Sequence, residues 1–264
     1  MSTVLEKILA QKQLRLLEQR KSFPLKELER KLAEAEPVRD AWAQILRPDP
    51  GSIPVIAELK RKSPSAGEMR MDLSPAQLAR AYEEAGARAI SVLCEQDHFG
   101  GRLEDLLEAK KNCGLPVLCK DFIISSFQVL LARLYGADLI LLIVKALEQR
   151  KLLGLYRLAR EMMMTPLVEA HNRAELELAL SIGARLIGIN NRDLATLEVN
   201  LDTTRDLLPL IPKDRIVVSE SGFQTRAELE EFRSLGVKAF LIGGSILASA
   251  DPGQKLRELV HGQG

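Results

Sequence analysis

The sequence predicts an α/β protein, a (β/α)8 TIM barrel with an N-terminal helical extension. Three observations carry this prediction: a chain of 264 residues, a phrase repeated along it, and short apolar runs that alternate with amphipathic stretches. One barrel of this type has about 250 residues, although the length alone would also accommodate two ordinary domains. The pattern along the chain therefore has to decide between them.

The repeated phrase starts at a glycine and continues into an apolar run. It occurs as Gly86-Ala87-Arg88-Ala89-Ile90, Gly136-Ala137-Asp138-Leu139-Ile140, Gly183-Ala184-Arg185-Leu186-Ile187 and Gly236-Val237-Lys238-Ala239-Phe240. A left-handed glycine that ends a helix and is followed by a strand has this pattern. Four further apolar runs are found at residues 55–59, 117–119, 166–168 and 216–218. Together the two sets give eight strands.

The helices between these strands have their own start signals. Ser74 and Gln77 form a capping-box pattern around Pro75, and Thr225 with Glu228 repeats the box later in the chain. Short, continuously apolar strands that alternate with helices indicate a parallel sheet covered by helices. Eight such units favour closure into a barrel over an open sheet, and no glycine-rich dinucleotide fingerprint follows the first strand.

Residues 1–50 precede the first strand and are expected to form one or two charged helices followed by a proline-rich connector at 47–51. We interpret 1–264 as a single TIM-barrel domain in which 1–50 is an N-terminal helical extension. The extension is expected to cover one end of the barrel; a lid, a brace or a partner helix is the alternative.

The composition limits the partners. Hydrophobic residues make up 46% of the chain, which is enough for a large core. Lys+Arg 37 against Asp+Glu 36 leaves no overall basic field to hold a nucleic acid, so we expect a small-molecule ligand. Three cysteines without metal-ligand spacing, no apparent leader and no long apolar segment predict a cytoplasmic protein without a membrane span. We expect a monomer rather than an oligomer.

Polar side chains end several of the predicted strands. They are Glu58 with Lys60, Lys120, Glu169, Asn190 and Glu220. Each alone could be a solvated loop residue or part of a local ion pair. However, the carboxyl ends of barrel strands meet at one mouth, where barrel enzymes assemble their active sites. Agreement among five strands therefore predicts a shared active site.

A second group of residues follows the last two strands. The segments are Ser219-Glu220-Ser221-Gly222 and Ile242-Gly243-Gly244-Ser245. Glycine amides near a helix N-terminus bind anions, and in barrels these two loops often hold phosphate, whereas the alternative is that these glycines serve only as turns. Ser63, after the first strand, could add a hydroxyl group. The predicted ligand is a phosphorylated metabolite.

Several segments, in this order, resemble the indole-3-glycerol phosphate synthase family over nearly the whole chain. They include Val55-Ile56-Ala57-Glu58-Leu59-Lys60 with Ser63-Pro64-Ser65, Ile90-Ser91-Val92-Leu93, Lys120-Asp121-Phe122-Ile123, Leu167-Val168-Glu169, Ile187-Gly188-Ile189-Asn190-Asn191-Arg192 and Ser219-Glu220-Ser221-Gly222. The resemblance implies a carboxy-lyase that converts 1-(2-carboxyphenylamino)-1-deoxyribulose 5-phosphate to indole-3-glycerol phosphate, with loss of carbon dioxide and water and without a cofactor.

The resemblance also implies roles for individual residues. Lys120 would be the principal general acid and Glu169 the base, while Lys60, oriented by Glu58, would hold the substrate carboxylate or act as a second acid. Asn190, Glu220 and Ser221 would hydrogen-bond the sugar and the catalytic groups. The remaining substrate contacts would be Arg192, the phosphate ligands Ser63, Gly222, Gly243 and Gly244, and the aromatic-ring contacts Leu93, Phe99, Phe122 and Leu141.

Other readings remain open from the residues alone. Another phosphosugar barrel, an isomerase or a Schiff-base aldolase, would use similar loops and lysines. A non-catalytic scaffold would be expected to lose its charged mouth residues. His98 and His171 are expected near the mouth, but no third ligand follows a metal-binding pattern, so we predict no metal site.

Overall fold

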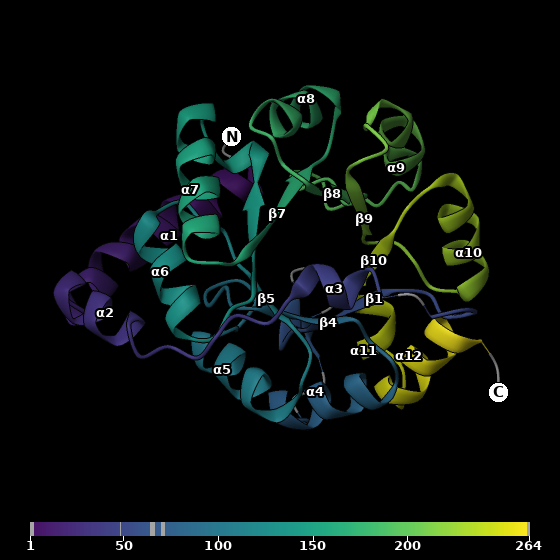
Figure 1. The fold of residues 1–264 in the computed structure, drawn as a ribbon, viewed down its shortest axis with the longest axis horizontal. Coiled ribbons are helices and arrows are strands. Elements are labelled where there is room, and N and C mark those ends of the chain that lie inside the picture. The colour runs from purple at the N-terminus through teal and green to yellow at the C-terminus, as the bar shows by residue number, and fades with distance from the viewer. Residues whose placement is uncertain (1–2, 48, 64–66, 70–71, 263–264) are drawn as a thin grey trace.

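The computed structural model of the protein describes residues 3–47, 49–63, 67–69 and 72–262. Pro48 of the connector and Pro64 and Ser65 of the loop after the first strand lie outside these residues. Eight parallel strands close into a barrel that is surrounded by helices (Figure 1). The predicted fold class is therefore confirmed.

All eight predicted strands are present, at the predicted places. They are β1 (Val55–Leu59), β4 (Ala89–Leu93), β5 (Val117–Lys120), β6 (Leu139–Ile143), β7 (Thr165–Ala170), β8 (Leu186–Asn190), β9 (Ile216–Glu220) and β10 (Ala239–Ile242). Around the barrel their order is β1-β10-β9-β8-β7-β6-β5-β4, so each strand lies beside its neighbour in the chain and β10 closes onto β1.

The connections between the strands are helical. They contain α4 (Pro75–Glu84), α5 (Leu103–Asn112), α6 (Ser126–Leu134), η1 (Val144–Ala146), α7 (Gln149–Glu161), α8 (Arg173–Ser181), α9 (Asp202–Leu207), η2 (Leu208–Leu210) and α10 (Arg226–Leu235), and the chain ends through α11 (Gly244–Leu247) and α12 (Pro252–His261). The capping boxes at Ser74 and Thr225 are confirmed. The four repeated glycines all have positive φ, between 79° and 122°, as a left-handed helix end requires.

Two apolar layers hold the barrel together. Along β6, Leu139 and Leu141 belong to the cluster inside the barrel, whereas Ile140 and Leu142 belong to the larger cluster between strands and helices. Because side chains alternate along a strand, both faces of each strand are buried. This explains why the strands are continuously apolar rather than alternating.

The first strand is followed by a small feature that the sequence analysis did not predict. β2 (Lys62–Ser63) pairs with β3 (Gly67–Glu68) in an antiparallel hairpin. With two residues in each strand, this hairpin is too short for a period-two pattern to reveal it. It lies in the long connection between β1 and α4.

The extension has three helices, one more than the most that the sequence analysis expected. They are α1 (Val4–Ser22), α2 (Leu25–Leu32) and α3 (Ala41–Ile45). The third has only five residues, and Asp40 caps its start by accepting a hydrogen bond from the backbone N–H of Ala43 at 2.9 Å. So short a helix has too little periodicity to be recognised in the sequence.

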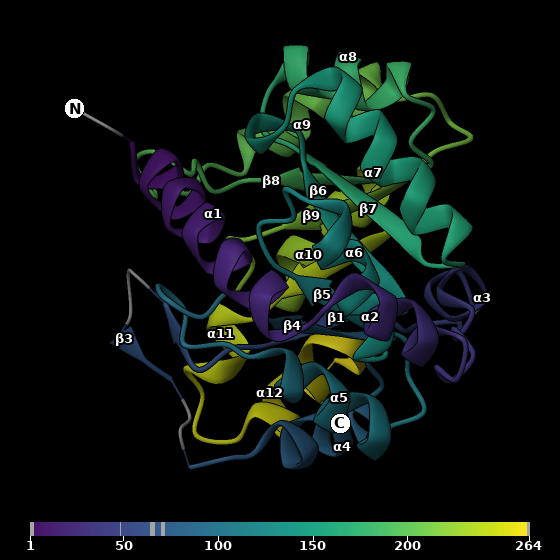
Figure 2. The same ribbon diagram turned by 90° about the vertical axis from the view of Figure 1, so that its left-hand side faces the viewer.

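The extension reaches both ends of the barrel (Figure 2). Lys12 of α1 contacts Asp121, which directly follows β5, so α1 lies at the mouth. Before α3, the backbone N–H of Arg39 donates to Asp138, which directly precedes β6 at the opposite end. Between these points Leu28 of α2 is fully buried in the outer core. Thus the extension does more than cover one end.

Among the described residues, no helix combines the length and the apolar character that crossing a membrane requires.

Candidate active site

Five of the predicted site residues lie at the carboxyl ends of five strands. Glu58 on β1 and Glu169 on β7 are the penultimate residues of their strands. Lys120 on β5, Asn190 on β8 and Glu220 on β9 are the last residues of theirs. The three carboxylates are 1–6% exposed. Parallel strands place their carboxyl ends at one mouth, so the closed barrel gathers these groups together.

A cavity of about 820 Å3 opens at this mouth. Its lining includes charged residues at or just after the strand ends (Glu58, Lys60, Lys120 and Glu220), together with Ser221, Arg192 and the glycines Gly222, Gly243 and Gly244. The structure thus brings most of the predicted catalytic residues together with three of the predicted phosphate ligands. Glu169 and Asn190 do not line this cavity, and both are buried, at 1% and 6% exposure.

Glu58 and Lys60 form an ion pair at the first strand, with Lys60 Nζ 2.8 Å from Glu58 Oε1. Burial would raise the pKa of Glu58, but the positive charges of Lys60 and Lys120 outweigh it and lower the pKa. Glu58 is therefore ionised at neutral pH and fixes the position of the Lys60 ammonium group.

Lys120 lies between two buried carboxylates. Its Nζ is 3.9 Å from Glu169 Oε2 and 3.9 Å from Glu220 Oε2. Burial would lower the pKa of Lys120, but Glu169, Glu220 and Glu58 together raise it above its ordinary value. The ammonium group is therefore charged and balances a cluster of acids.

The two carboxylates beside Lys120 differ in charge. Burial and the negative charge of Glu169 raise the pKa of Glu220 to about 8. Burial would also raise the pKa of Glu169, yet His171 and Lys120 lower it to about 2. At neutral pH Glu169 is thus ionised and Glu220 is mostly protonated. Two neighbouring acids with separated pKa values can divide acid and base roles.

Gly188 makes room for Glu220. A side chain on Gly188 would start on top of Glu220 Oε1, on the neighbouring strand. This glycine belongs to the motif Ile187-Gly188-Ile189-Asn190-Asn191-Arg192, and its packing role was not predicted. The signal was available, because a glycine inside a strand marks a close approach of another group.

The two glycine loops after β9 and β10 lie side by side. Ser245 Oγ donates to the backbone oxygen of Phe223 at 2.8 Å and ties the loops together. Ser221 and Gly222 have φ of 65° and 98°, so the chain turns sharply away from β9. A left-handed serine is uncommon, and such conformations cluster at functional sites. The loops form one wall of the cavity.

Each predicted phosphate glycine has a different environment. A Cβ on Gly222 would lie 2.7 Å from Val199 and one on Gly243 would lie 2.5 Å from Glu58 Oε1, whereas one on Gly244 meets nothing within 4 Å. The side chain of the fourth predicted ligand, Ser63, lies outside the described part of the structure, although its backbone belongs to β2.

Three of the four predicted aromatic-ring contacts belong to one cluster. Phe122 and Leu141 are buried in the inner core, and Phe99 packs against it. Leu93 is also buried and pairs in register with Lys120, but it lines a separate small cavity beside β1. The structure therefore groups Phe99, Phe122 and Leu141 and sets Leu93 apart from them.

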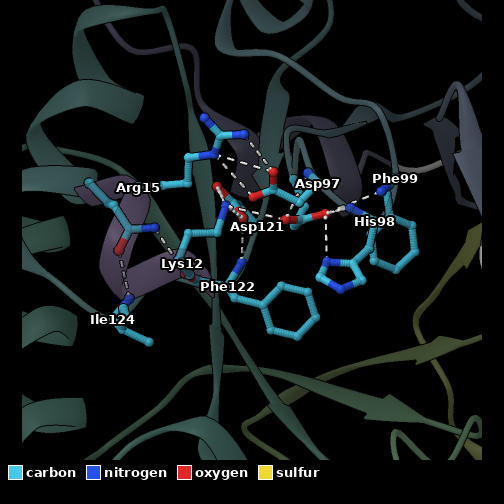
Figure 3. Close-up of polar contacts among 10 residues, drawn as sticks. Lys12, Arg15, Asp97, His98, Phe99, Asp121, Phe122 and Ile124 are labelled. Atoms are coloured by element: carbon cyan, nitrogen blue, oxygen red, sulfur yellow. Dashed lines mark hydrogen bonds and ion pairs between the residues drawn. The ribbon is translucent and has the colours of Figure 1, made fainter. Parts of the chain in front are cut away.

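Helix α1 holds the two loops that carry these phenylalanines (Figure 3). Lys12 Nζ lies 2.8 Å from Asp121 Oδ1 and 3.8 Å from Glu95 Oε1. Asp121 accepts the backbone N–H of Phe122 at 2.7 Å, and Glu95 accepts that of Phe99 at 3.1 Å. One buried lysine thus contacts both carboxylates, each of which holds one of the two loops.

Sequence reasoning missed Lys12. It also missed polar residues that line the main cavity, among them Gln224 and Lys255. Lys12 and Lys255 lie in helices with many charged residues, so no sequence signal distinguishes them. His171 was noted only as a loop residue near the mouth, yet its Nε2 is 3.2 Å from Glu169 Oε1. Within the described residues, no cluster of three or more His, Cys, Asp or Glu is arranged to hold a metal ion.

Comparison with known proteins gives a consistent result. Residues 5–259 match the family model described as indole-3-glycerol phosphate synthase. The chain is 40% identical over 259 residues to the indole-3-glycerol phosphate synthase of Alkaliphilus metalliredigens (strain QYMF), covering 98% of each chain. It is 43% identical over 261 residues to the protein of the same name from Laribacter hongkongensis (strain HLHK9), covering 98% of this chain and 99% of that one.

More distant likenesses to solved structures concern the fold alone. The thiamine phosphate pyrophosphorylase from Pyrococcus furiosus superposes with a TM-score of 0.57 at 15% identity, over 79% of this chain and 94% of that one. The 3-hexulose-6-phosphate synthase from Salmonella typhimurium gives a TM-score of 0.57 at 15% identity, over 78% and 96% of the two chains.

Proposed function

The chain belongs to the indole-3-glycerol phosphate synthase family, and from this membership we propose how the residues at its mouth divide the reaction. The enzyme is a carboxy-lyase of tryptophan biosynthesis. It converts 1-(2-carboxyphenylamino)-1-deoxyribulose 5-phosphate to indole-3-glycerol phosphate and releases carbon dioxide and water. Ring closure, decarboxylation and dehydration have to share one pocket.

One observation carries the proposed division of roles. A single cavity contains a lysine–carboxylate cluster and, as part of its lining, two glycine loops. The cluster can move protons, whereas the loops offer backbone N–H groups to an anion. A substrate with a phosphate at one end and the reacting carbons at the other can contact both parts at once.

We assign the principal general acid to Lys120. Ring closure turns the substrate ketone into an alkoxide, which has to be protonated, and the hydroxyl group formed leaves later as water. Lys120 is charged, its side chain is only 16% exposed, and carboxylates lie on two sides of its ammonium group. A fixed ammonium group also stabilises negative charge that develops on oxygen, because little water screens it.

We assign the base to Glu169. The proton removed after dehydration leaves a cationic intermediate and is therefore strongly acidic, so even a carboxylate of low basicity accepts it. Glu169 is ionised at neutral pH because its pKa is held at about 2. Its neighbour Glu220, with a pKa of about 8, carries a proton at the same pH and can donate a hydrogen bond to a sugar oxygen.

The other predicted residues orient the substrate. Lys60, fixed by Glu58, is placed to hold the substrate carboxylate or to act as the second acid. Asn190 accepts the backbone N–H of Arg192 at 3.0 Å, which supports a joint role of these two residues at the end of β8. Ser221, in its left-handed turn, would hydrogen-bond the sugar.

The ends of the substrate have separate binding regions in this proposal. Gly222, Gly243 and Gly244, with Ser63, would bind the phosphate. The apolar group of Phe99, Phe122 and Leu141 would contact the aromatic ring, whereas Leu93 lines a separate small cavity. Burial of an aromatic ring against such side chains supplies binding energy, whereas the amides supply orientation.

The test of the base assignment is the substitution Glu169→Gln. The amide keeps the shape of the side chain but cannot accept the proton, so we expect turnover to fall by about 10²–10⁴-fold while substrate binding is nearly retained. Indole fluorescence measures product formation from the carboxyphenylamino substrate. Full activity in this variant would eliminate the assignment.

We further propose that the enzyme works as a cytoplasmic monomer. Cys94, Cys113 and Cys119 are all free and buried, which is compatible with a reducing compartment. Light scattering during size-exclusion chromatography measures the molar mass, and a value near twice 29.3 kDa would contradict the monomer.

A further inference from the structure

His171 lies beside the proposed base, Glu169. The sequence alone indicated no role for His171 in acid–base chemistry or in metal binding. It comes two residues after Glu169, so both side chains leave β7 and its extension on the same side. The imidazole Nε2 is 3.2 Å from Glu169 Oε1, and the side chain is 5% exposed. The ring is therefore a buried neighbour of Glu169.

The other side of the ring faces a second carboxylate. His171 Nδ1 is 3.0 Å from Glu175 Oε2, and the backbone N–H of His171 donates to the same oxygen at 2.9 Å. Because each ring nitrogen faces an acceptor, the arrangement favours an imidazolium ion with both nitrogens protonated. Burial would lower the pKa of His171, but Glu169 and Glu175 raise it to about 10.

The start of α8 fixes this geometry. Asn172 is the N-cap residue and accepts the backbone N–H of Glu175 at 3.0 Å. Its own Nδ2 donates to Glu175 Oε1 at 2.7 Å. The cap of the helix thus orients Glu175, and Glu175 in turn orients the imidazole. A sequence of the form Glu-x-His-Asn-x-x-Glu encodes the whole arrangement.

The charge of Lys120 does not favour ionisation of one of its two neighbouring acids, Glu169 and Glu220, over the other. Its Nζ is 3.9 Å from an oxygen of Glu169 and 3.9 Å from an oxygen of Glu220, so it attracts negative charge on either equally. Of these two acids, Glu169 is the one within ion-pair distance of the imidazolium ion, with His171 Nε2 3.2 Å from Glu169 Oε1. Coulombic attraction falls with distance, so the ion favours charge on Glu169.

Other charged groups around these residues do not remove this bias. Besides Glu169 and Glu175, His171 interacts at longer range with Glu220 of β9 and with Asp193, which follows β8 and lies 4.0 Å from Lys145 of η1. Glu169 has Lys120 of β5, Asn190 of β8 and Glu220 as its further neighbours. Glu58 of β1 adds negative charge near Glu220.

We propose that His171 is a positioning residue that keeps Glu169 ionised as the base and leaves the proton of the acid pair on Glu220. This inference rests on the proposed roles of the two glutamates. In this proposal the connection between β7 and α8 also has an electrostatic role: the helix cap holds Glu175, which stabilises the His171 cation beside the carboxylate of Glu169.

The first experiment observes the cation without using activity. The chain has three histidines, so 15N spectra of the imidazole groups are simple, and His171→Gln identifies the signal of His171 by deletion. We expect that signal to stay in the imidazolium form from pH 6 to about pH 9. A signal that titrates near the ordinary value of about 6.5 would overturn the proposal.

The second experiment follows the effect on the base. In His171→Gln the acidic limb of the kcat/KM profile, set by Glu169 with its pKa of about 2, should move upward by about one pH unit or more. The loss of activity should therefore grow as the pH is lowered toward that limb and be smallest at neutral pH. A merely structural role would lower activity by the same factor at every pH. An unmoved limb would overturn the proposal.

Two further variants serve as rescue and control. His171→Lys restores a cation near Glu169, and the acidic limb should return toward that of the unmodified enzyme. His98→Gln removes the other mouth histidine, which lies 3.7 Å from Glu95, and should leave the acidic limb in place. If Glu169→Gln kept full activity while the NMR result held, the base assignment would fail and the imidazolium ion would stand.

Discussion

At the scale of single residues, the mouth of the barrel places the ammonium group of Lys120 among carboxylates that are almost fully buried. Lys120 has carboxylates on two sides, and the charge of each depends on it. Neither oxygen of Glu220 has a hydrogen-bond partner among the described residues, although the residue is 1% exposed and Lys120 is its ion-pair neighbour at 3.9 Å. Buried groups of this kind lower stability and are retained where chemistry requires them.

Lys120→Met should therefore affect both activity and stability. The substitution keeps the length and apolar stem but removes the proposed acid, so turnover should fall by about 10²–10⁴-fold. Because the folded protein raises the pKa of Lys120, its charge contributes stability at all pH values below its ordinary pKa. We expect a lower melting temperature at pH 7, measured by differential scanning calorimetry.

The pH dependence of this loss provides the check. As the pH falls, the neighbouring carboxylates are protonated and lose the negative charge that Lys120 stabilises. The difference in melting temperature between the unmodified enzyme and Lys120→Met should therefore shrink. A variant that turns over normally yet melts early would show that Lys120 is a structural residue and not the acid.

Glu220→Gln should behave in the opposite way toward stability. Folding raises the pKa of Glu220 from an ordinary 4.5 to about 8, so the folded state loses stability as the pH rises through this interval. A neutral amide avoids that loss. We expect the variant to melt above the unmodified enzyme at pH 8, by about 2–4 °C for each kcal/mol gained, with little difference at pH 5. A gain that does not grow with pH would contradict the assigned charge.

The sequence indicated the charged residues at the mouth better than it indicated the residues that support them. Glu58, Lys120, Glu169 and Glu220 end strands, and strand ends can be read from apolar runs. Lys12 could not be found in this way, because it reaches Asp121 from a residue 109 positions away, and only the folded chain brings the two together. Leu93 was grouped with the other apolar contacts because its strand position matched, while its actual neighbours depend on how α4 and β1 pack.

At the scale of elements, the loop between β10 and α11 shows how two adjacent glycines can have different purposes. A methyl group on Gly243 would lie 2.5 Å from Glu58 Oε1 and 2.8 Å from Glu58 Cβ. On Gly244 it would meet nothing within 4 Å. Glycine at the first position is therefore required by packing against a charged side chain on the neighbouring strand.

Gly243→Ala should lower kcat by about tenfold or more, because the methyl group displaces Glu58 and frees Lys60 from its ion pair. Gly244→Ala is the matched control one residue away and should retain most of kcat. Steady-state kinetics on both variants, with circular dichroism to verify folding, measures the difference. If the two substitutions changed kcat equally, the contact between Gly243 and Glu58 would not be important for activity, and the prediction would be wrong.

The predictability of the elements follows from their length and period. The eight barrel strands and the capped helices α4 and α10 repeat local signals that sequence alone contains. The hairpin β2–β3 and helix α3 are too short for any period, and their positions depend on what they contact. For α3 that contact is the inner core at the far end of the barrel, where Ala41 and Ile45 are 1% and 2% exposed.

At the scale of the whole molecule, the extension is attached to the barrel at several separate points. Lys12 and Arg15 of α1 pair with acids at the mouth, the latter with Asp97 at 2.8 Å. Near the other end, Asp49 lies 2.9 Å from Arg88, whose side chain is 1% exposed. Attachments at both ends, with buried apolar contacts between them, favour a single cooperative unit over a barrel with a separate lid.

The single tryptophan makes this prediction testable, because Trp42 lies on α3, where the Arg185 guanidinium carbon is 5.1 Å from its ring centroid. Its fluorescence reports the extension, whereas far-UV circular dichroism reports mainly the barrel. In urea the two signals should give one midpoint, and Lys12→Met should lower both equally, since breaking a buried ion pair costs up to about 3–5 kcal/mol. Lys7→Met, an exposed position on the same helix, should change stability by less than about 0.5 kcal/mol. A tryptophan transition that precedes the circular dichroism transition would show that residues 1–50 unfold on their own, and the division into one domain would then be wrong.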